Sequence, residues 1–131
     1  MTEEPSGGAD VELAVARSTL EAARLLARAG FHRDAVTRSY YAIFHAASGL
    51  LATTGRRART HEGLRSLISE HFVRPGLLDA EHARSLRRTA GDRNDADYDA
   101  ASVFAEDDSR EGLARAEAFV LAVEAILSSK R

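Results

Sequence analysis

The amino-acid sequence predicts an all-α protein, an antiparallel up-and-down bundle of four to five helices. Apolar residues recur at the spacing of a helix, and the alternation typical of strands is almost missing. Short polar connections separate long amphipathic segments, which is typical of helix bundles. A chain of 131 residues is long enough to bury one core. We therefore expect a single domain over residues 9–129, after a disordered lead at residues 1–8.

Two long helices are expected at the start of the domain. Residues 9–29 carry a seam of alanine and leucine, and Gly30 ends the pattern. Residues 33–54 carry a broad apolar face, and Gly55 follows them. The two segments are expected to pack antiparallel, because only a few residues join them.

Capping and helix-breaking residues predict the positions of the next two helices. Thr60 is expected to cap a short third helix that Pro75 ends, and Asp79 is expected to cap a fourth. Gly91 is expected to end the regular pattern of this fourth helix. The polar stretch over residues 92–107 is ambiguous between helix and loop.

The last helix is expected to begin near Asp108, because Asp108 and Glu111 resemble a capping box. Its apolar residues recur with helical spacing to the end of the domain. The core of the bundle is predicted to include seven large side chains. They are Leu20, Tyr40, Ile43, Phe44, Leu67, Val120 and Leu127.

The composition excludes several kinds of site. The chain has no cysteine, which excludes disulfides and thiolate metal sites, and it lacks the Glu-x-x-His repeat of di-iron bundles. We expect no metal and no cofactor. No apolar run approaches the roughly 20 residues that span a bilayer, and the first residues do not resemble a signal peptide. The sequence favours a cytoplasmic protein with no membrane partner.

The charges are unevenly distributed along the chain, although the net charge is only −2. Residues 56–93 carry nine basic and five acidic residues, whereas residues 94–131 carry four basic and nine acidic residues. All basic residues except Lys130 are arginine. Two interpretations are open: the codon bias of a GC-rich genome, or a surface that binds phosphate, which arginine grips bidentately.

A narrow second face of the helix over residues 33–54 carries Arg38, Ala42, His45 and Gly49. It lies opposite the broad apolar face of the same helix. Small residues permit the close approach of another helix, so we expect a homodimer with this face at or near the shared cleft. Arg38 and His45 lie two turns apart, a gap that a substrate phosphate can span. The alternative is structural: an arginine paired with a neighbouring helix and a histidine bound to a carbonyl.

Four segments in order carry a family resemblance. They are Arg38-Ser-Tyr-Tyr-Ala-Ile-Phe-His45, Thr60-His61 with Gly63, Phe72-Val73, and Arg93 followed by Ala96-Asp97-Tyr98-Asp99. With these segments, over residues 10–128, the sequence resembles a bacterial and archaeal branch of the HEPN (higher eukaryotes and prokaryotes nucleotide-binding) superfamily. The resemblance implies a four- or five-helix bundle that forms a symmetric dimer with a composite cleft.

The resemblance also implies a choice of functions. Many members are metal-independent ribonucleases with an Arg–x(4–6)–His motif, others bind RNA or nucleotides without cleavage, and several pair with a minimal nucleotidyltransferase as toxin–antitoxin systems. In the nuclease members the motif lies just before the last helix. Here Arg93 is followed by Asn94, and Tyr98 stands where the histidine would follow a four-residue gap.

Metal-free RNA cleavage needs a base, an acid and a cation near the phosphate. Histidine can serve as the first two and arginine as the third. Arg38 with His45, on one helix, and Arg56 with His61, across a loop, both satisfy the motif spacing. The candidate catalytic residues are Arg38, His45 and Arg93. The candidate ligand-binding residues are Tyr41, Arg56, Arg57, Arg59, Asp97 and Tyr98.

Arg93 and Asp97 lie one helical turn apart and are expected to form an ion pair. The sequence as a whole predicts a HEPN-domain protein that binds RNA or a nucleotide in a dimer cleft. The resemblance implies that the protein is the partner of a minimal nucleotidyltransferase in a toxin–antitoxin-like or defence module. Two alternatives stay open: an active metal-independent endoribonuclease that acts as a toxin, and a non-catalytic protein-interaction module.

Overall fold

The computed structural model describes residues 5–129, with side chains from residue 8 onward, and this part of the chain is all-α. A short π-helical segment, η1, continues the third helix, and no strand occurs within residues 5–129. The elements in order are α1 (Pro5–Arg28), α2 (His32–Ala52), α3 (His61–Ile68), η1 (Ser69–Val73), α4 (Ala80–Tyr98) and α5 (Glu106–Ser129). The predicted all-α bundle is confirmed.

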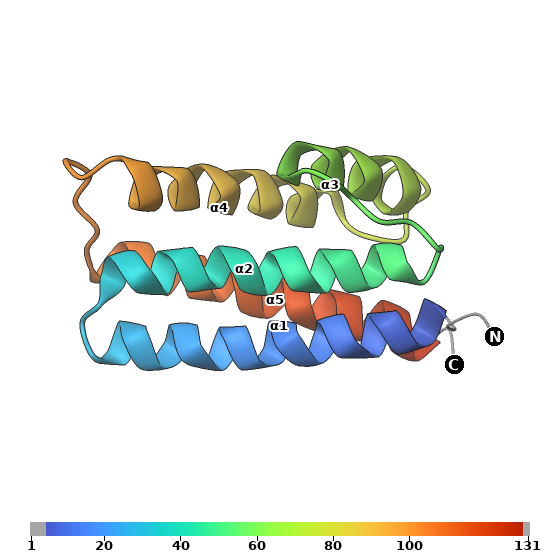
Figure 1. Cartoon of the computed structure of the whole chain (residues 1–131), viewed down its shortest axis with the longest axis horizontal. Coiled ribbons are helices and arrows are strands. Elements are labelled where there is room, and N and C mark those ends of the chain that lie inside the picture. Colours follow the sequence, from blue (N-terminus) through green and yellow to red (C-terminus); the bar gives the residue numbers. More distant parts are fainter. Residues whose placement is uncertain (1–4, 130–131) are drawn as a thin grey trace.

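Helix α2 lies at the centre of the bundle. Figure 1 shows α1 and α2 side by side and antiparallel, with α5 behind them and α4 along the other side of α2. The short α3 lies beside the N-terminal part of α4, and α2 contacts each of the other α-helices. Because α2 is covered from several directions, most of its residues are buried.

The broad apolar face of α2 forms the middle of the core. Tyr40, Ile43, Leu50 and Leu51 are at most 1% exposed, and each fully buried aliphatic side chain contributes about 1.5–3 kcal/mol to folding. The prediction is confirmed for five of the seven core residues. Phe44 and Leu67 are only partly buried and pack against the edge of the core. The five confirmed residues are Leu20, Tyr40, Ile43, Val120 and Leu127.

Two predicted helix caps are confirmed. The Thr60 hydroxyl accepts a hydrogen bond from the Gly63 N–H at 2.8 Å, and the Asp79 carboxylate accepts one from the Glu81 N–H at 2.9 Å. Each cap satisfies an N–H group that has no partner within the helix. The caps determine where α3 and α4 begin.

The predicted starts of the first and last helices need correction. Helix α1 begins at Pro5, inside the lead that was expected to be disordered, while residues 1–4 lie outside the described part. Proline is tolerated in the first turn of a helix, because its missing N–H has no partner there. Helix α5 begins at Glu106, and the Asp108 carboxylate accepts a hydrogen bond from the Ala105 N–H at 2.8 Å. Asp108 is therefore a first-turn acceptor rather than the capping residue.

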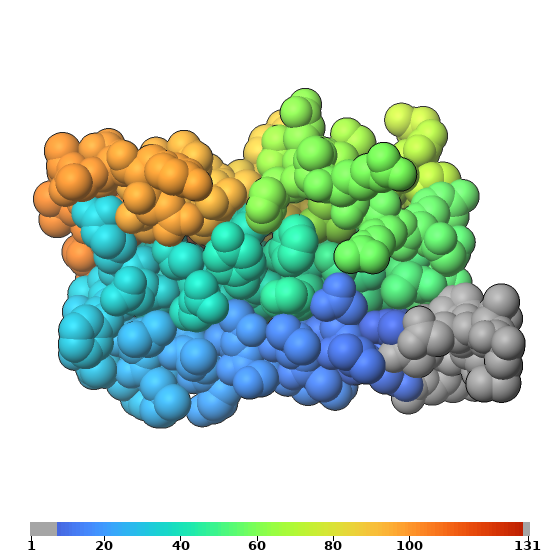
Figure 2. Space-filling model, viewed as in Figure 1, coloured from blue at the N-terminus to red at the C-terminus, as the bar shows by residue number. Residues whose placement is uncertain are grey.

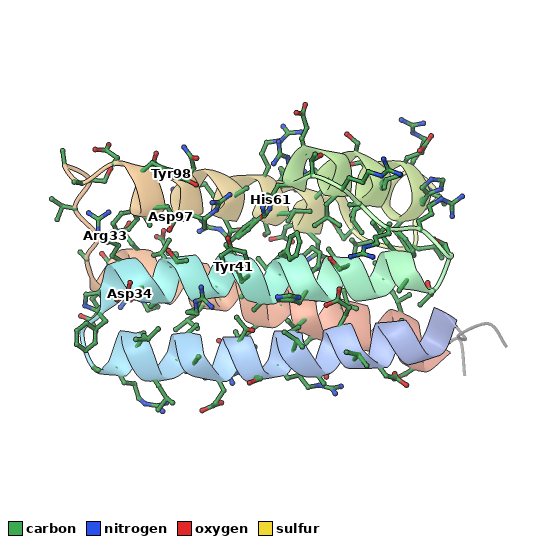
Figure 3. The ribbon with its side chains drawn as sticks, viewed as in Figure 1. Arg33, Asp34, Tyr41, His61, Asp97 and Tyr98 are labelled. Atoms are coloured by element: carbon green, nitrogen blue, oxygen red, sulfur yellow. The ribbon has the colours of Figure 1, made fainter. Side chains whose placement is uncertain are left out.

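Helix α4 does not end at Gly91 but continues to Tyr98. Gly91 has no positive φ and faces open space, so it weakens the helix without ending it. The residues beyond it are held by tertiary contacts. Arg33 of α2, labelled in Figure 3, donates hydrogen bonds to the carbonyl oxygens of Ala96 (2.8 Å) and Ser102. This side chain ties the end of α4 and the following loop to α2.

The small-residue face of α2 is covered by α1 of the same chain. Ala42, Ala46 and Gly49 are buried, and a Cβ atom at Gly49 would lie 3.2 Å from both the Ala9 carbonyl oxygen and the Glu12 Cβ. The expectation that these small residues serve the approach of a second copy is therefore corrected for Ala42 and Gly49, which α1 covers. Close packing of two helices within one chain already requires the small residues.

Two glycine substitutions test the different roles of Gly91 and Gly49. Gly91→Ala is expected to raise the free energy of unfolding by about 0.5–1 kcal/mol, because alanine is the better helix former and the site is open.

Gly49→Leu is expected to lower the free energy of unfolding by about 1–3 kcal/mol, because the side chain has no room beside α1. Urea denaturation measures both values. A Gly49→Leu variant as stable as the wild type would contradict the α1–α2 contact described here.

Candidate functional site

Polar and aromatic side chains from three helices meet where α3 and α4 face α2. The space-filling view shows a notch between α3 and the C-terminal half of α4, above α2 (Figure 2). Figure 3 labels His61 and Tyr41 beside this notch. The residues in contact are Tyr40 and Tyr41 of α2, His61 at the start of α3, and Arg93 of α4. We refer to these four residues as the Arg93 cluster.

Arg93 is the charged residue of the cluster and is largely buried. Its side chain is 14% exposed and forms an ion pair with Asp97 at 3.1 Å, as predicted. The guanidinium carbon lies 5.3 Å from the Tyr40 ring centroid and 5.9 Å from that of Tyr41, within the range of a cation–π interaction. Burial alone would lower the pKa of Arg93, but Asp97 and the tyrosines outweigh it and raise the pKa. Arg93 is therefore a fixed positive charge.

One nitrogen of Arg93 has no partner. Its Nε is buried and makes no hydrogen bond among the described residues. Asp97 accepts from Nη1, so the pairing leaves donors of the guanidinium available. An unsatisfied buried donor costs about 1–3 kcal/mol, and such groups call for an explanation. Nε itself has almost no accessible surface, so a ligand oxygen could meet this guanidinium only through the small part of the side chain that is exposed.

Tyr40 and His61 connect α2 to α3. The Tyr40 hydroxyl and the His61 Nδ1 form a hydrogen bond. Tyr40 is 1% exposed, and burial raises its pKa to about 12. The phenol therefore keeps its proton at neutral pH and donates it to Nδ1, its sole hydrogen-bond acceptor among the described residues.

The bond from Tyr40 determines how His61 can act. Burial lowers the pKa of His61 below its usual 6.5, and the nearby charges of Arg93 and Arg65 lower it further. The imidazole is therefore neutral at pH 7. Because Nδ1 accepts from Tyr40, the remaining proton lies on Nε2. His61 thus presents an uncharged N–H donor beside the fixed charge of Arg93.

Arg38 and Asp97 extend the cluster along α2 and α4. The Arg38 guanidinium carbon lies 5.1 Å from the Tyr41 ring centroid. The Thr37 hydroxyl donates to the Asp97 carboxylate at 3.4 Å, a long and weak hydrogen bond. The structure therefore brings together Arg38, Tyr41, Arg93 and Asp97, all of which were predicted site residues.

The other predicted residues lie around the cluster rather than in it. His45 faces α1, where its Nδ1 lies 3.0 Å from the Glu12 carboxylate. The Phe44 ring contacts both His45 and His61 and separates them. Tyr98 is 75% exposed at the end of α4 and makes no hydrogen bond or ring contact within residues 5–129. The contact with Glu12 matches the structural alternative for His45, with a carboxylate in place of a carbonyl.

The three loop arginines precede α3 directly. All three are exposed, and two of them line a shallow cavity of about 510 Å³. None forms an ion pair with the residues described. They are Arg56, Arg57 and Arg59.

His61 was not among the candidate site residues, although its spacing from Arg56 was noted. The available signal was Tyr40, whose position on the apolar face of α2 buries a hydroxyl that needs a partner. Nothing in the sequence indicated that His61 would supply it. Among the described residues, His, Asp and Glu side chains form no group of three or more that could hold a metal ion.

The sequence of the helical bundle identifies the class of protein. The sequence model of the HEPN domain matches residues 12–126, and the chain belongs to the HEPN family. This confirms the resemblance. Within residues 5–129, no helix combines the length and apolarity needed to cross a bilayer.

Relatives from bacteria and archaea share much of the chain. A UPF0332 protein of Thermotoga maritima is 30% identical over 112 residues, which cover 86% of this chain and 85% of that protein. A protein of Methanocaldococcus jannaschii named "Putative toxin" is 36% identical over 84 residues, covering 64% of this chain and 63% of that protein. A UPF0332 protein of Pyrococcus horikoshii is 34% identical over 79 residues, which cover 60% of this chain and 56% of that protein.

The protonation of His61 can be measured. In the folded protein His61 is expected to titrate below pH 6.5, and Arg93→Gln is expected to raise its pKa, because one nearby cation is lost. Arg28→Gln, at the end of α1, should leave the pKa unchanged. NMR titration of the imidazole protons measures all three values.

The same shift has a consequence for stability. The unfolded chain takes up the His61 proton at a higher pH than the folded chain, so this contribution to stability is lost as the pH falls below about 6.5. A His61 pKa above 6.5 in the wild type would contradict the neutral imidazole.

Proposed function

We propose that this HEPN-domain protein binds RNA or a nucleotide at the Arg93 cluster. The observation that carries the proposal is the largely buried Arg93 guanidinium, which is stacked on Tyr40 and Tyr41 and keeps a small exposed part beside Arg38 and His61. Membership of the HEPN family and the relative named "Putative toxin" support it at a coarser level.

The cluster offers each of the groups that a nucleotide needs. Arg93 and Arg38 supply positive charge for phosphate oxygens. His61 supplies a neutral N–H donor for a phosphate, ribose or base oxygen. The half-buried ring of Tyr41 supplies an aromatic surface beside these charges, and aromatic stacking is a common way to hold an unpaired base.

Binding is favoured over cleavage because the cluster has no free base. Neither ring nitrogen of His61 is free to accept a proton at neutral pH, because Nδ1 accepts from Tyr40 and Nε2 already carries a proton. To act as a base, the ring must first exchange its tautomer, so that Nδ1 donates to the Tyr40 oxygen instead of accepting from its hydroxyl. Asp97 is already paired with Arg93.

A metal-independent ribonuclease is the second candidate, and the observation that favours it is the imidazole beside a fixed guanidinium. If the ring exchanges its tautomer when substrate binds, His61 can take the 2′-hydroxyl proton as the 2′-oxygen bonds to phosphorus, while Arg93 stabilises the negative charge on the phosphorane oxygens. The P–O5′ bond then breaks, and the leaving 5′-oxygen takes a proton from solvent. The products would then be a 2′,3′-cyclic phosphate and a 5′-hydroxyl. His45 is the other candidate base, on the far side of Phe44.

A homodimer and a nucleotidyltransferase partner complete the proposal, and both rest on the family resemblance. Because α1 covers the small-residue face of α2, we place the shared cleft on the side of Arg38 and Arg93. A protein-interaction module without RNA binding is the outcome that would replace this account.

Substitution of Arg93 tests the binding proposal. The affinity for a single-stranded RNA of about eight nucleotides is expected to fall at least about tenfold in Arg93→Gln, which corresponds to about 1.4 kcal/mol for a lost charge-assisted contact. Fluorescence anisotropy with labelled RNA measures the dissociation constant. Arg28→Gln removes the same charge on α1 and should change it less than about twofold. If the wild-type protein binds neither RNA nor a nucleotide, the proposal is contradicted.

Incubation with the same RNA separates the binder from the nuclease. We expect the RNA to stay intact with the wild type, with or without EDTA, in denaturing gel analysis. Cleavage that persists in EDTA and is lost in His61→Gln would mean that the Arg93 cluster is a catalytic site and not only a binding site. Cleavage lost only in His45→Gln would move the catalytic site to the other side of Phe44.

A further inference from the structure

A second cationic site lies beside the Arg93 cluster, between α3, η1 and α4. It is a cavity of about 370 Å³, a volume within the range of small-ligand pockets. The lining combines three guanidinium groups, two hydroxyls and one carboxylate. The residues are Glu62, Arg65, Ser66, Ser69, Arg74 and Arg87.

The guanidinium groups of the three arginines in this cavity make no ion pair or hydrogen bond with the residues described. Among residues 5–129, six other arginines have a carboxylate partner. Three positive charges and one negative charge around one cavity leave it with two excess positive charges. Such a set of donors is suited to an anion with several oxygens, since each guanidinium can bind two of them. The six paired arginines are Arg17, Arg24, Arg88, Arg93, Arg110 and Arg115.

The backbone is irregular at this cavity. The π-helical segment η1 runs over Ser69–Val73, and the Arg74 N–H donates to the Ser69 carbonyl at 2.9 Å. This wide turn begins and ends with a residue that lines the cavity. Single π-helical turns are frequent at functional sites, because they are less stable than a regular helix.

Arg65 connects the cavity with the Arg93 cluster. It lies one turn after His61 on α3, about 6 Å along the helix, and its charge lowers the pKa of both His61 and Tyr40. Arg87 lies six residues before Arg93 on α4, about 9 Å along the axis and on a different face of the helix. The connection between the two sites therefore runs through Arg65, past which an extended anion would continue into the cavity.

We propose that this cavity binds a second phosphate group of a single-stranded RNA whose neighbouring nucleotide is held by the Arg93 cluster. The proposal rests on the proposed function and specifies its ligand: an oligonucleotide rather than a mononucleotide. The arginines bind the non-bridging phosphate oxygens, and the hydroxyls of Ser66 and Ser69 donate to the same group. Contacts to phosphate position the strand without reading its sequence.

The test compares charge variants against RNA and against a mononucleotide. Arg74 and Arg87 are exposed, so the double variant Arg74→Gln/Arg87→Gln is expected to fold, which circular dichroism checks. For a single-stranded RNA of about eight nucleotides its dissociation constant should rise at least about tenfold. For AMP the constant should change less than about twofold. The slope of log affinity against log salt should become shallower by about 0.7 for each lost phosphate contact.

Two further variants serve as opposite controls. Glu62→Gln removes the one carboxylate of the cavity and should tighten RNA binding by about twofold or more. Arg28→Gln should have no comparable effect, because it lies at the end of α1. If Arg28→Gln and the double variant lose RNA affinity to the same extent, the proposal is overturned, because the change in net charge alone would explain the loss.

The remaining outcomes separate this proposal from the proposed function. If Arg93→Gln weakens RNA binding and the double variant does not, the second site is wrong and the Arg93 cluster stands. If the double variant weakens AMP and RNA equally, the cavity holds a terminal phosphate of a free nucleotide, and the RNA-strand proposal is overturned. If the wild type binds neither ligand, both proposals fail.

Discussion

Three helices meet at the side chain of Tyr40. Its ring is 1% exposed, so its hydroxyl must find a hydrogen-bond partner inside the protein. His61 supplies that partner from the first turn of α3, and Arg93 of α4 stacks on the same ring. Tyr40 therefore contacts polar groups of both α3 and α4, beside the core packing of Leu64, Ile68 and Leu86.

The same contact determines the chemistry of the surface above it. A phenol with a pKa of about 12 keeps its proton, so the imidazole must accept it at Nδ1. The cations nearby disfavour a second proton on the ring. One constraint thus produces a neutral donor next to a permanent positive charge. This pair suits an oxygen-rich anion and is poorly arranged for proton abstraction.

Local signals in the sequence were enough to predict much of the architecture. Thr60 and Asp79 cap helices as expected, because a cap involves only residues a few positions apart. The Arg93–Asp97 pair was predictable for the same reason, since it spans one helical turn. Gly91 was misleading, because propensity is weak beside the tertiary contacts that hold the end of α4.

The neighbours of α2 could not be predicted from helical periodicity. A helical wheel correctly placed Ala42 and Gly49 on one face, but it could not say that α1 of the same chain covers that face. The partners His45–Glu12 and Tyr40–His61 join residues 33 and 21 positions apart, and only the packing of the bundle brings them together. The candidate site was therefore predicted in part: Arg93, Asp97, Arg38 and Tyr41 were named, and His61 was not.

The central claim is that a ligand contacts the guanidinium of Arg93. Its Nε–H resonance is a probe of this contact, because the buried Nε belongs to the same guanidinium and makes no hydrogen bond among the described residues. Titration with a single-stranded RNA of about eight nucleotides should shift the Arg93 Nε–H and the His61 imidazole resonances together, with the same dissociation constant. The His45 resonances, on the α1 side, should move much less. A titration that shifts His45 and leaves Arg93 and His61 unchanged would contradict the account.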